Sequence, residues 1–421
     1  MVKSAFPKYR DRIIYREQCM EAAIREGSVE VNVAYSKVYG ARFFVNGWGI
    51  ASIQSGRVNW NLLEEVAYKN ALMASETRNI IEFKDKPVYT GKVKLGGKVG
   101  DPEEVLERAE TIRAYADETG AFLEASIISS NRAKRIIHEW GEAYEDKTIV
   151  EAYVYIKIGN NVGSSATSFT GSIENLSDNV LEKLVEKAYE RAMANVKARN
   201  LPPTSRGKNT VILLHEASGA LIHELVHLLE ADQRSFLPIG TRVSTIDLSL
   251  IDDPFLLFSP AARYFDDEVY PVSRKILVDK GEVVSLLQTR LTASRHSGDK
   301  PGNATGLFHI PKAMHSTLIM KPGDWREEEI LEETRSGIIV DSIIMASMRD
   351  GVVTIIPEVC WMIRRGEILK PIRVSRIVLP IVKSLMTVDA ISRTRDFRHS
   401  FEKGHIVVEA SPVIRTQGYV E

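Results

Sequence analysis

Ala220-Leu-Ile-His-Glu-Leu-Val-His-Leu-Leu-Glu230 carries the strongest pattern in the chain, because His223 and His227 stand four residues apart and Glu224 follows the first. Residues four apart lie on one face of a helix, so both imidazoles would project from the same side. Two neutral imidazoles can bind one Zn²⁺, and a glutamate between them can take a proton from metal-bound water. The stretch therefore has the H-E-x-x-H pattern of zinc hydrolases.

The flanking residues predict that this helix is buried. A buried helix rarely carries two histidines and two glutamates without a functional reason, since burying polar groups costs free energy. The alternative is a pair of core histidines that are satisfied by hydrogen bonds. The apolar positions are Ala220, Leu221, Ile222, Leu225, Val226, Leu228 and Leu229.

Composition indicates an ordinary globular protein with room for two domains. The chain has 421 residues, of which 44% are hydrophobic and 26% charged. A net charge of -1 gives no support for nucleic acid or an anionic membrane as a partner. Cys19 and Cys360 lie far apart and form no disulfide framework. With no signal-peptide or membrane-spanning pattern, we expect a cytoplasmic protein.

The first half predicts an α/β domain. Apolar residues at helical spacing predict a helix over residues 8–26 that ends at Gly27. Further helices are expected at about 62–74, 101–119 and 175–195, and strands at 28–38, 40–45, 49–55, 121–129, 133–139 and 149–158. A Pro-rich break over residues 199–208 places the domain boundary, giving domains 1–205 and 206–421.

The second half predicts a β-rich domain around the H-E-x-x-H helix. Thr210 to Leu214 has the composition of a buried strand, and His215 to Gly219 is expected to form a turn into the helix. Beyond the helix, strand patterns predominate, with short helices at 327–336 and 379–386. The fold class is therefore α+β. The main strand ranges are 269–279, 282–289, 315–321, 337–346, 351–364 and 406–416.

At this point the chain resembles the TldD/PmbA family of zinc-dependent peptidases, and the resemblance covers most of it. Three blocks in order carry it: residues 217–232; Phe265-Asp-Asp-Glu268 with residues 278–288; and Gly298-Asp-Lys-Pro-Gly-Asn-Ala304. The last two are similar to that family's "FDDEG…ENG…GYL" and "STGNAR" segments. We expect the loop at residues 294–304 to lie at the rim of the active site.

The resemblance implies an N-terminal α/β domain that forms a cavity wall and dimer contacts, and a β-rich C-terminal metallopeptidase domain. It also implies two paired subunits enclosing a cavity that only unfolded peptides can enter. Bacterial members pair a metal-carrying TldD with a TldE (PmbA) subunit that has lost the metal. Because His223, Glu224 and His227 are all present, this chain is similar to the catalytic type.

The spacing of the motif departs from the family pattern. The family places three residues between His-Glu and the second His, whereas only Leu225 and Val226 intervene here. One residue fewer turns the second ligand by about 100° on a regular helix. The shorter spacing is therefore the easier one for two ligands on an unbroken helix.

The family's third ligand is a cysteine ahead of a C-terminal segment that is similar to Ser411-Pro-Val-Ile-Arg415, and no cysteine precedes that segment here. Counting back from Pro412 to the position of the family's cysteine reaches Arg398. We therefore expect the neighbouring His399 to replace the thiolate. His405 and Cys360 are the reserves. A carboxylate is a further alternative for the third ligand, and the candidates are Glu230, Asp232, Asp266, Asp267 and Glu268. A hydrogen bond that orients a metal ligand, or one that closes a turn, suits these residues better.

The expected function is zinc-dependent hydrolysis of unfolded or short peptides inside a dimer, with His223, His227 and His399 as ligands and Glu224 as general base. The partner is a second copy or a TldE/PmbA-like paralogue. One alternative is a non-hydrolytic, TldE-like scaffold with a structural metal, and another is hydrolysis of an ester or a modified amide. Whether His296, His309 and His315 line the cavity stays open.

Overall fold

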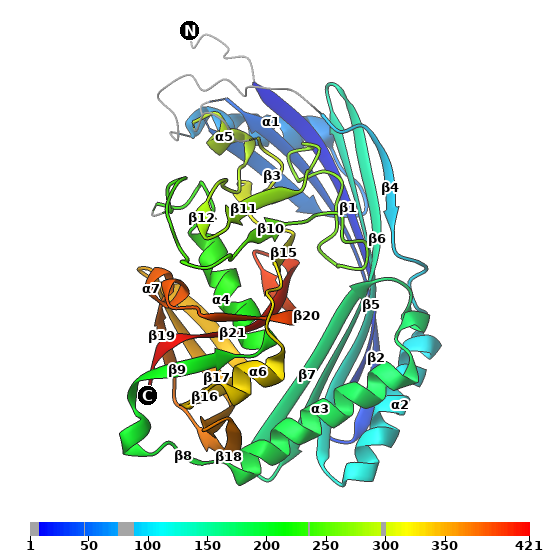
Figure 1. Cartoon of the computed structure of the whole chain (residues 1–421). Helices are drawn as coiled ribbons and strands as arrows, with labels where there is room; N and C mark the ends of the chain where they lie inside the picture. The colour runs from blue at the N-terminus through cyan, green and yellow to red at the C-terminus, as the bar shows by residue number, and fades with distance from the viewer. Residues whose placement is uncertain (1–7, 46, 75–87, 235, 296–299) are drawn as a thin grey trace.

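The computed structural model describes residues 8–45, 47–74, 88–234, 236–295 and 300–421. These residues form a mixed α/β structure with two large sheets side by side (Figure 1). The N-terminal sheet is seven-stranded in the order β3-β2-β1-β5-β6-β4, with β7 also paired to β6. Its strands are β1 (Tyr9–Arg25), β2 (Ser28–Phe44), β3 (Trp48–Gln54), β4 (Gly91–Leu95), β5 (Phe122–His138), β6 (Gly141–Ile158) and β7 (Asn161–Thr170).

The helix predicted at residues 8–26 is wrong, because this segment is strand β1. It pairs along its whole length with β2 and, from Asp11 to Ile24, with β5. Glu26 and Gly27, both at positive φ, form a tight two-residue turn between β1 and β2. Tyr9, Asp11 and Ile13 are buried at alternate positions. Tertiary pairing on both edges therefore overrides the helical spacing of the apolar residues.

Three helices in the N-terminal half confirm the sequence pattern. They are α1 (Trp60–Met73), α2 (Pro102–Thr119) and α3 (Asp178–Lys197). The side chain of Asp101 caps α2, and the carboxylate of Glu104 accepts a hydrogen bond from the backbone N–H of Asp101. Apolar faces of α2 and α3 pack on the sheet in one buried cluster with β1, β5 and β6. These helices give that sheet its covered face (Figure 1).

The C-terminal half is strand-rich, as predicted, and its main sheet has twelve strands. Its central order is β10-β15-β21-β9-β16-β17-β18, and β20 pairs with β21. Two short strands, β13 (Ala304–Thr305) and β14 (Lys312–Ala313), pair separately. The strands of the main sheet are β8 (Arg199–Asn200), β9 (Gly207–Leu213), β10 (Leu250–Asp252), β11 (Lys275–Asp279), β12 (Glu282–Val283), β15 (Thr317–Met320), β16 (Ser336–Arg349), β17 (Val352–Arg364), β18 (Glu367–Arg373), β19 (Ile377–Pro380), β20 (Ala390–Glu402) and β21 (His405–Val420).

Helix α4 (His215–His227) carries the motif and packs against β16, β20 and β21. The turn predicted at His215 to Gly219 is wrong, because α4 begins at His215 directly after β9. The remaining helices are short: α5 (Arg290–Ala293), α6 (Glu327–Glu332) and α7 (Ile381–Met386).

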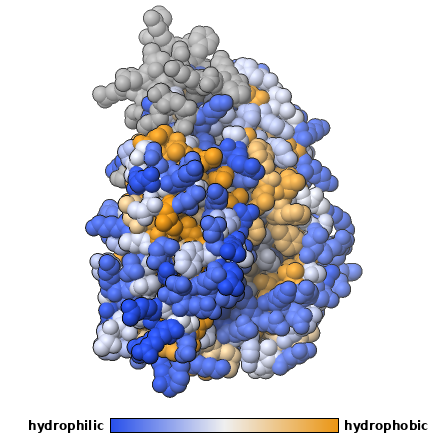
Figure 2. All heavy atoms as spheres, in the orientation of Figure 1, coloured by the Kyte–Doolittle hydropathy of each residue, from blue (hydrophilic) through white to orange (hydrophobic). Residues whose placement is uncertain are grey.

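The two halves contact each other through an apolar cluster that includes Ile13 and Ile136 from the first sheet and Phe265 and Leu307 from the second half. The boundary between residues 205 and 206 stays a prediction. Figure 2 shows the molecular surface hollowed between the two halves, with apolar residues on one wall. Within the described ranges, no helix combines the length and the apolar character needed to cross a membrane.

Candidate metal centre

Helix α4 is held rigidly inside the C-terminal half. Every residue from Ala217 to Val226 is buried. A Cβ at Gly219 would lie 3.2 Å from the Cβ of Arg398 and 3.4 Å from that of Glu409. Glycine at this position therefore lets the β20-β21 hairpin approach the helix closely, and the hairpin brings its own polar side chains to the histidines.

His223 and His227 lie next to each other on α4, with ring centroids 5.0 Å apart. The Nδ1 atom of His223 lies 2.7 Å from Oε1 of Glu409, and that of His227 lies 3.1 Å from Oε1 of Glu230. A carboxylate only accepts hydrogen bonds, so each Nδ1 donates and each Nε2 is left as an acceptor. This is the arrangement in which carboxylates orient histidine ligands of a metal.

Glu402 supplies a third possible donor. One ligand atom each from His223, His227 and Glu402 lie within 4.8 Å of one another. Glu402 is the last residue of β20, beside the Lys403-Gly404 turn whose positive φ angles reverse the chain. Two imidazoles and one carboxylate are a donor set that Zn²⁺ uses in peptidases.

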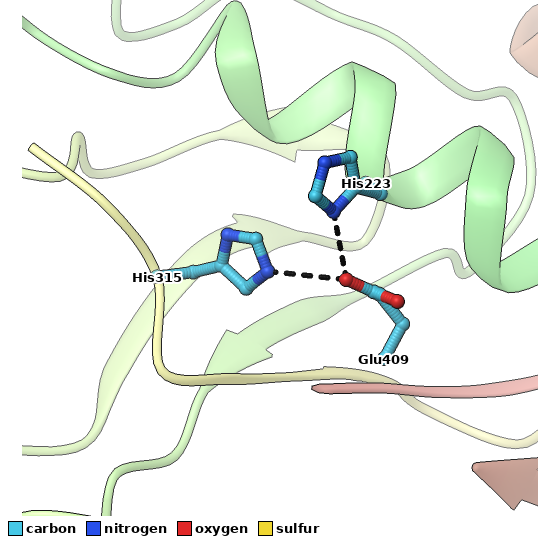
Figure 3. A group of neighbouring side chains, drawn as sticks. All are labelled: His223, His315 and Glu409. Atoms are coloured by element: carbon cyan, nitrogen blue, oxygen red, sulfur yellow. Dashed lines mark hydrogen bonds and ion pairs between the residues drawn. The ribbon is translucent and has the colours of Figure 1, made fainter. Parts of the chain in front are cut away.

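Glu409 lies fully buried on β21 and binds several groups at once (Figure 3). Its Oε1 accepts from His223 and, at 3.3 Å, from Nε2 of His315; Nη1 of Arg398 donates to its Oε2 at 2.7 Å. Burial opposes ionisation, but Arg398 and the two histidines outweigh it and hold the pKa of Glu409 well below its usual value. Glu409 therefore fixes the ring of His223 and forms a buried cluster with it and His315.

Glu230 plays the same part for His227. It is fully buried, and Lys403 donates to both of its oxygens at 2.9 Å. Burial would raise the pKa of Glu230, but His227 and Lys403 lower it to about 2. Burial would likewise lower the pKa of His227, but the hydrogen bond to Glu230 raises it. Glu230 is thus ionised and holds the ring of His227.

Glu224 is buried, with 8% of its surface exposed. Over the described part of the chain, no hydrogen bond or ion pair engages its carboxylate. A carboxylate with free lone pairs beside two histidines can accept a proton from a water molecule in the same space.

His399 is in neither donor group. Its neighbours Arg398 and Ser400 contact Glu409 on the helix side of β20. Side chains alternate along a strand, so His399 points to the opposite face. There it lines a separate pocket with His215 and Glu216, and burial lowers its pKa to about 4. The structure thus brings Glu402, three residues on, to the place that the sequence assigned to His399.

The reserve ligands also lie elsewhere. Nε2 of His405 lies 3.9 Å from Oδ2 of Asp267 in the space between the two sheets. Cys360 is a buried core residue of β17, and burial raises the pKa of its thiol. His215 begins α4, and its Nδ1 lies 2.9 Å from the carbonyl of Ser411.

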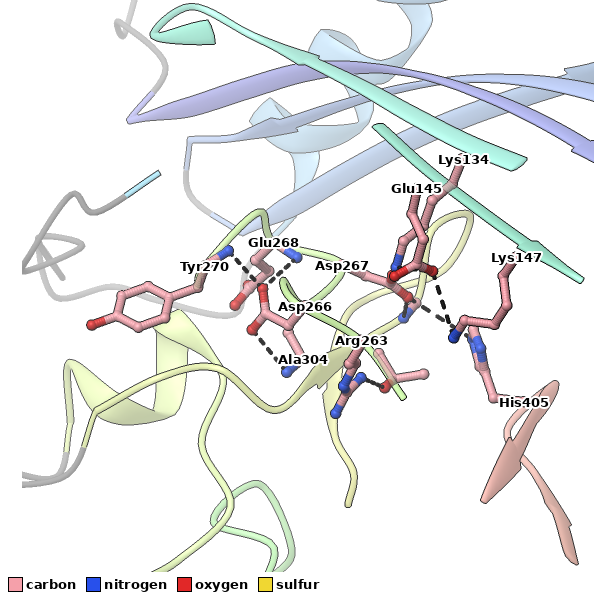
Figure 4. Close-up of polar contacts among 12 residues, drawn as sticks. Lys134, Glu145, Lys147, Arg263, Asp266, Asp267, Glu268, Tyr270, Ala304 and His405 are labelled. Carbon is pink, nitrogen blue, oxygen red and sulfur yellow. Dashed lines mark hydrogen bonds and ion pairs between the residues drawn. The ribbon is translucent and has the colours of Figure 1, made fainter. Parts of the chain in front are cut away.

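The acidic Asp266-Asp267-Glu268 cluster supports a turn (Figure 4). Asp266 accepts hydrogen bonds from the backbone amides of Glu268, Tyr270 and Ala304. Asp267 accepts from Nζ of Lys134 at 3.0 Å. The bonds of Asp266 stay within the C-terminal half, whereas the bond between Lys134 and Asp267 joins the two halves of the chain. Asp232 also accepts from a backbone amide, that of Ala313.

Sequence reasoning missed Glu402, Glu409 and the role of His315. Glu409 had a signal, since it interrupts the apolar run Ile406-Val-Val-Glu-Ala410, where a charge needs a partner. Glu402 had none, because a glutamate beside a Lys-Gly turn is typical of an exposed hairpin end. His309 and His315 line the cavity between the sheets, whereas His296 and residues 296–299 of the predicted rim lie outside the described residues.

Comparison with known proteins places the chain among metalloproteases. Residues 206–414 match the model of the PmbA/TldA metallopeptidase C-terminal domain. A metalloprotease of Methanocaldococcus jannaschii is 28% identical over 402 residues, covering 90% of this chain and 87% of that protein. A metalloprotease of Methanothermobacter thermautotrophicus is 28% identical, over 57% of this chain and 54% of the relative.

The crystal structure of TldE from Thermococcus kodakarensis has the same fold. It superposes with a TM-score of 0.76 at 16% identity, covering 98% of this chain and 96% of that one. The sequence matches define a metalloprotease, an enzyme class that depends on a metal cofactor. The chain belongs to the TldD/PmbA family.

Proposed function

We propose that this protein is a zinc-dependent peptidase of the catalytic TldD type. The supporting observation is that His223 and His227 each have Nδ1 held by a buried carboxylate and leave Nε2 for a metal. Glu402 completes a His₂Glu donor set. In place of His399, we therefore propose Glu402 as the third ligand.

The donor set fits a catalytic site better than a structural one. A structural zinc site fills four positions with protein donors, whereas the group of His223, His227 and Glu402 offers three within the described part of the chain. When bound, the ion would lower the pKa of a water molecule and polarise a substrate carbonyl. The remaining steps belong to side chains of the protein.

Glu224 is the proposed general base. It follows His223 on α4 and has a carboxylate without a protein partner in the described residues. It would take the proton from the attacking water and later give it to the leaving amine. Glu409 and Glu230 would keep the two imidazoles oriented throughout, since both are buried and ionised.

The substrate is proposed to be an unfolded or short peptide in an extended conformation. Strand β20 carries Glu402 and forms its ladder with β21, whereas its other edge is bridged to Trp325 at Ser392, ten residues before Glu402. A peptide could add to its other edge and bind through backbone amides, with little selectivity for side chains. A groove of about 980 Å³ borders His227 and offers room nearby.

Pairing with a second subunit is part of the proposal. The partner would be a second copy or a TldE/PmbA-like paralogue, and the dimer would enclose the cavity that admits the peptide. The resemblance to the family supports this, as does the fold shared with TldE. A cytoplasmic location without nucleic-acid or membrane partners stays a prediction.

Glu224→Gln tests the mechanism. We expect an unstructured peptide to be cleaved at peptide bonds by the wild type and not by the variant, as followed by mass spectrometry. Zinc content should be unchanged, because Glu224 is not in the donor group. Glu65→Gln, at an exposed position on α1, is the matched control and should retain activity.

Cleavage that persists in Glu224→Gln would refute this role. A wild type with a full complement of zinc and no cleavage would favour a non-hydrolytic, TldE-like scaffold with a structural metal. Cleavage of an ester or a modified amide alone would show that the protein hydrolyses a bond other than the peptide bond.

A further inference from the structure

A second cavity, of about 310 Å³, lies between the N-terminal sheet and the loops of the C-terminal half. Strands β5 and β6 form one wall with Arg132, Lys134, Glu145 and Lys147, and Arg263 borders it from the other half. The proposed mechanism uses none of these side chains. Figure 4 shows Lys134, Glu145 and Lys147 grouped between the two halves, with Arg263 nearby.

Positive charge is concentrated on the strand wall. In the β5-β6 ladder, Lys134 lies directly opposite Glu145, but Arg132 lies directly opposite Lys147. Like charges opposite each other destabilise a sheet unless an anion compensates them. Arg132 is paired with Glu17 at 3.0 Å. The ammonium of Lys147 is bonded to the backbone carbonyls of Pro260 and Ala262, and its nearest carboxylate oxygen, Oε1 of Glu145 at 3.7 Å, is shared with Lys134.

Arg263 adds a buried cation with neutral partners. Its Nη1 donates to the hydroxyl of Thr305 at 3.2 Å and its Nη2 to the carbonyl of Met314 at 3.1 Å. Its Nε has no partner in the described structure, and neither does Oε2 of Glu145. Buried polar groups are normally paired, so both atoms indicate that a polar group is missing from this region.

The charges in the cavity therefore do not balance. Two cations of the lining are paired with carboxylates outside it, Arg132 with Glu17 and Lys403 with Glu230. The other three, Lys134, Lys147 and Arg263, face the carboxylates of Glu145 and Asp267, which leaves an excess of one positive charge. Burial lowers the pKa of Lys147 to about 8; Glu145 opposes this shift, and the neighbouring cations Lys134, Arg263 and Arg132 act in the same direction as burial. One additional negative charge would restore neutrality, which favours a monoanion over a dianion.

We propose that this cavity binds a carboxylate, with Arg263 and Lys147 as its cationic partners. A planar guanidinium matches a carboxylate geometrically. The cavity is about ten times the volume of one water molecule, roughly 30 Å³, so the carboxylate can carry a small residue with it. The unpaired oxygen of Glu145 can accept an amide N–H next to that carboxylate.

A carboxylate next to an amide is the C-terminal end of a peptide. His315 lines the cavity and contacts Glu409, which holds His223; Lys403 also lines it and contacts Glu230. The cavity is thus connected to both metal histidines through one carboxylate each. Holding a peptide end here rests on the proposed peptidase function, whereas binding of a simple carboxylate does not.

Isothermal titration calorimetry of the full-length protein tests the site with acetate, N-acetylalanine, N-acetylalaninamide and inorganic phosphate. We expect N-acetylalanine to bind roughly tenfold or more tightly than its amide, because the amide leaves Arg263 and Lys147 uncompensated. Binding of N-acetylalanine above acetate identifies a peptide end, and equal binding identifies a free carboxylate. Phosphate should bind more weakly than either.

Arg263→Gln and Lys147→Met should each weaken N-acetylalanine binding roughly tenfold and leave the amide unaffected. Arg10→Gln and Lys69→Met, at exposed positions, are the matched controls. Two different variants keep the test valid if one does not fold, which circular dichroism would reveal. Equal binding of acid and amide overturns the proposal, as does binding that survives both substitutions, because the carboxylate would then be bound elsewhere. None of these results depends on hydrolysis.

Discussion

At the scale of single residues, the centre depends on which face of β20 each side chain takes. His399 and Glu402 are three residues apart, so alternation puts them on opposite faces of the strand. Ser400, on the same face as Glu402, contacts Glu409 beside His223. A chemically suitable ligand in the sequence is therefore less decisive than its position in the strand register.

Metal content separates the two candidate ligands. Loss of a residue that only orients a metal ligand lowers metal affinity roughly 10–100-fold. Glu402→Gln should lower zinc affinity by more than this, because it removes a proposed ligand. His399→Ala is the control on the same strand and should leave zinc content unchanged. Zinc per chain, measured by atomic emission after dialysis against a weak chelator, checks this. Loss of zinc in His399→Ala with retention in Glu402→Gln would restore His399 as the ligand.

Lys147 should make stability depend on pH. Its pKa is lowered to about 8 in the folded protein, from 10.5. Between these values the unfolded chain binds more protons, so the free energy of unfolding should rise with pH, by up to about 3 kcal/mol. Lys147→Met should lose this rise, as measured by urea unfolding at several pH values. A parallel pH dependence in both proteins would contradict the assignment.

At the scale of elements, close packing positions the helices. A Cβ at Gly163 of β7 would lie 2.1 Å from the backbone oxygen of Ala188 and 2.2 Å from the backbone nitrogen of Ala192. Helix α3 therefore packs on β7 backbone to backbone, and only glycine fits at that contact. The sequence pattern predicted helix α3, but it did not predict that the helix packs against Gly163.

Gly163→Ala should accordingly destabilise the protein by at least about 1–3 kcal/mol, because the backbone of α3 must move away. Gly56→Ala is the matched control: its added Cβ meets no atom within 4 Å, and the change should stay within about 0.5 kcal/mol. Denaturant midpoints of the two variants provide the measurement. Equal midpoints would show that α3 can shift without cost.

In the whole molecule, the arginine of a buried ion pair joins the N-terminal half to the C-terminal half. Arg42 on β2 has no exposed surface and donates to both oxygens of Asp11. It also donates to the backbone carbonyls of Gly306 and Asp267 in the C-terminal half. One guanidinium therefore links the first sheet to the loops that border the cavity proposed to bind a carboxylate.

Arg42→Ala should cost about 3–5 kcal/mol, since it leaves Asp11 as a buried charge without its cation. The loss should be accompanied by faster proteolysis in the loops around residue 306. Arg10→Ala, directly before Asp11 in the sequence but with an exposed side chain, should change neither quantity measurably. Thermal unfolding and limited proteolysis measure both effects. An Arg42→Ala protein as stable as Arg10→Ala would show that the halves associate without this link.

Elements with local signals could be predicted from the amino-acid sequence alone. The caps of α2, the amphipathic run of α3 and the H-E-x-x-H spacing of α4 lie within one or two helical turns, so the pattern could be recognised without the fold. The strand-rich character of the C-terminal half was equally visible. Family membership followed from three short blocks in order.

The other features depend on contacts between residues far apart in the chain, so they could be known only from the folded protein. Pairing with β2 and β5 made residues 9–25 a strand despite helical spacing. The register of the β20-β21 hairpin put Glu402 and Glu409 beside α4 and turned His399 away. A change of one residue in that register would reverse every side chain's face, and no local pattern in the sequence encodes it.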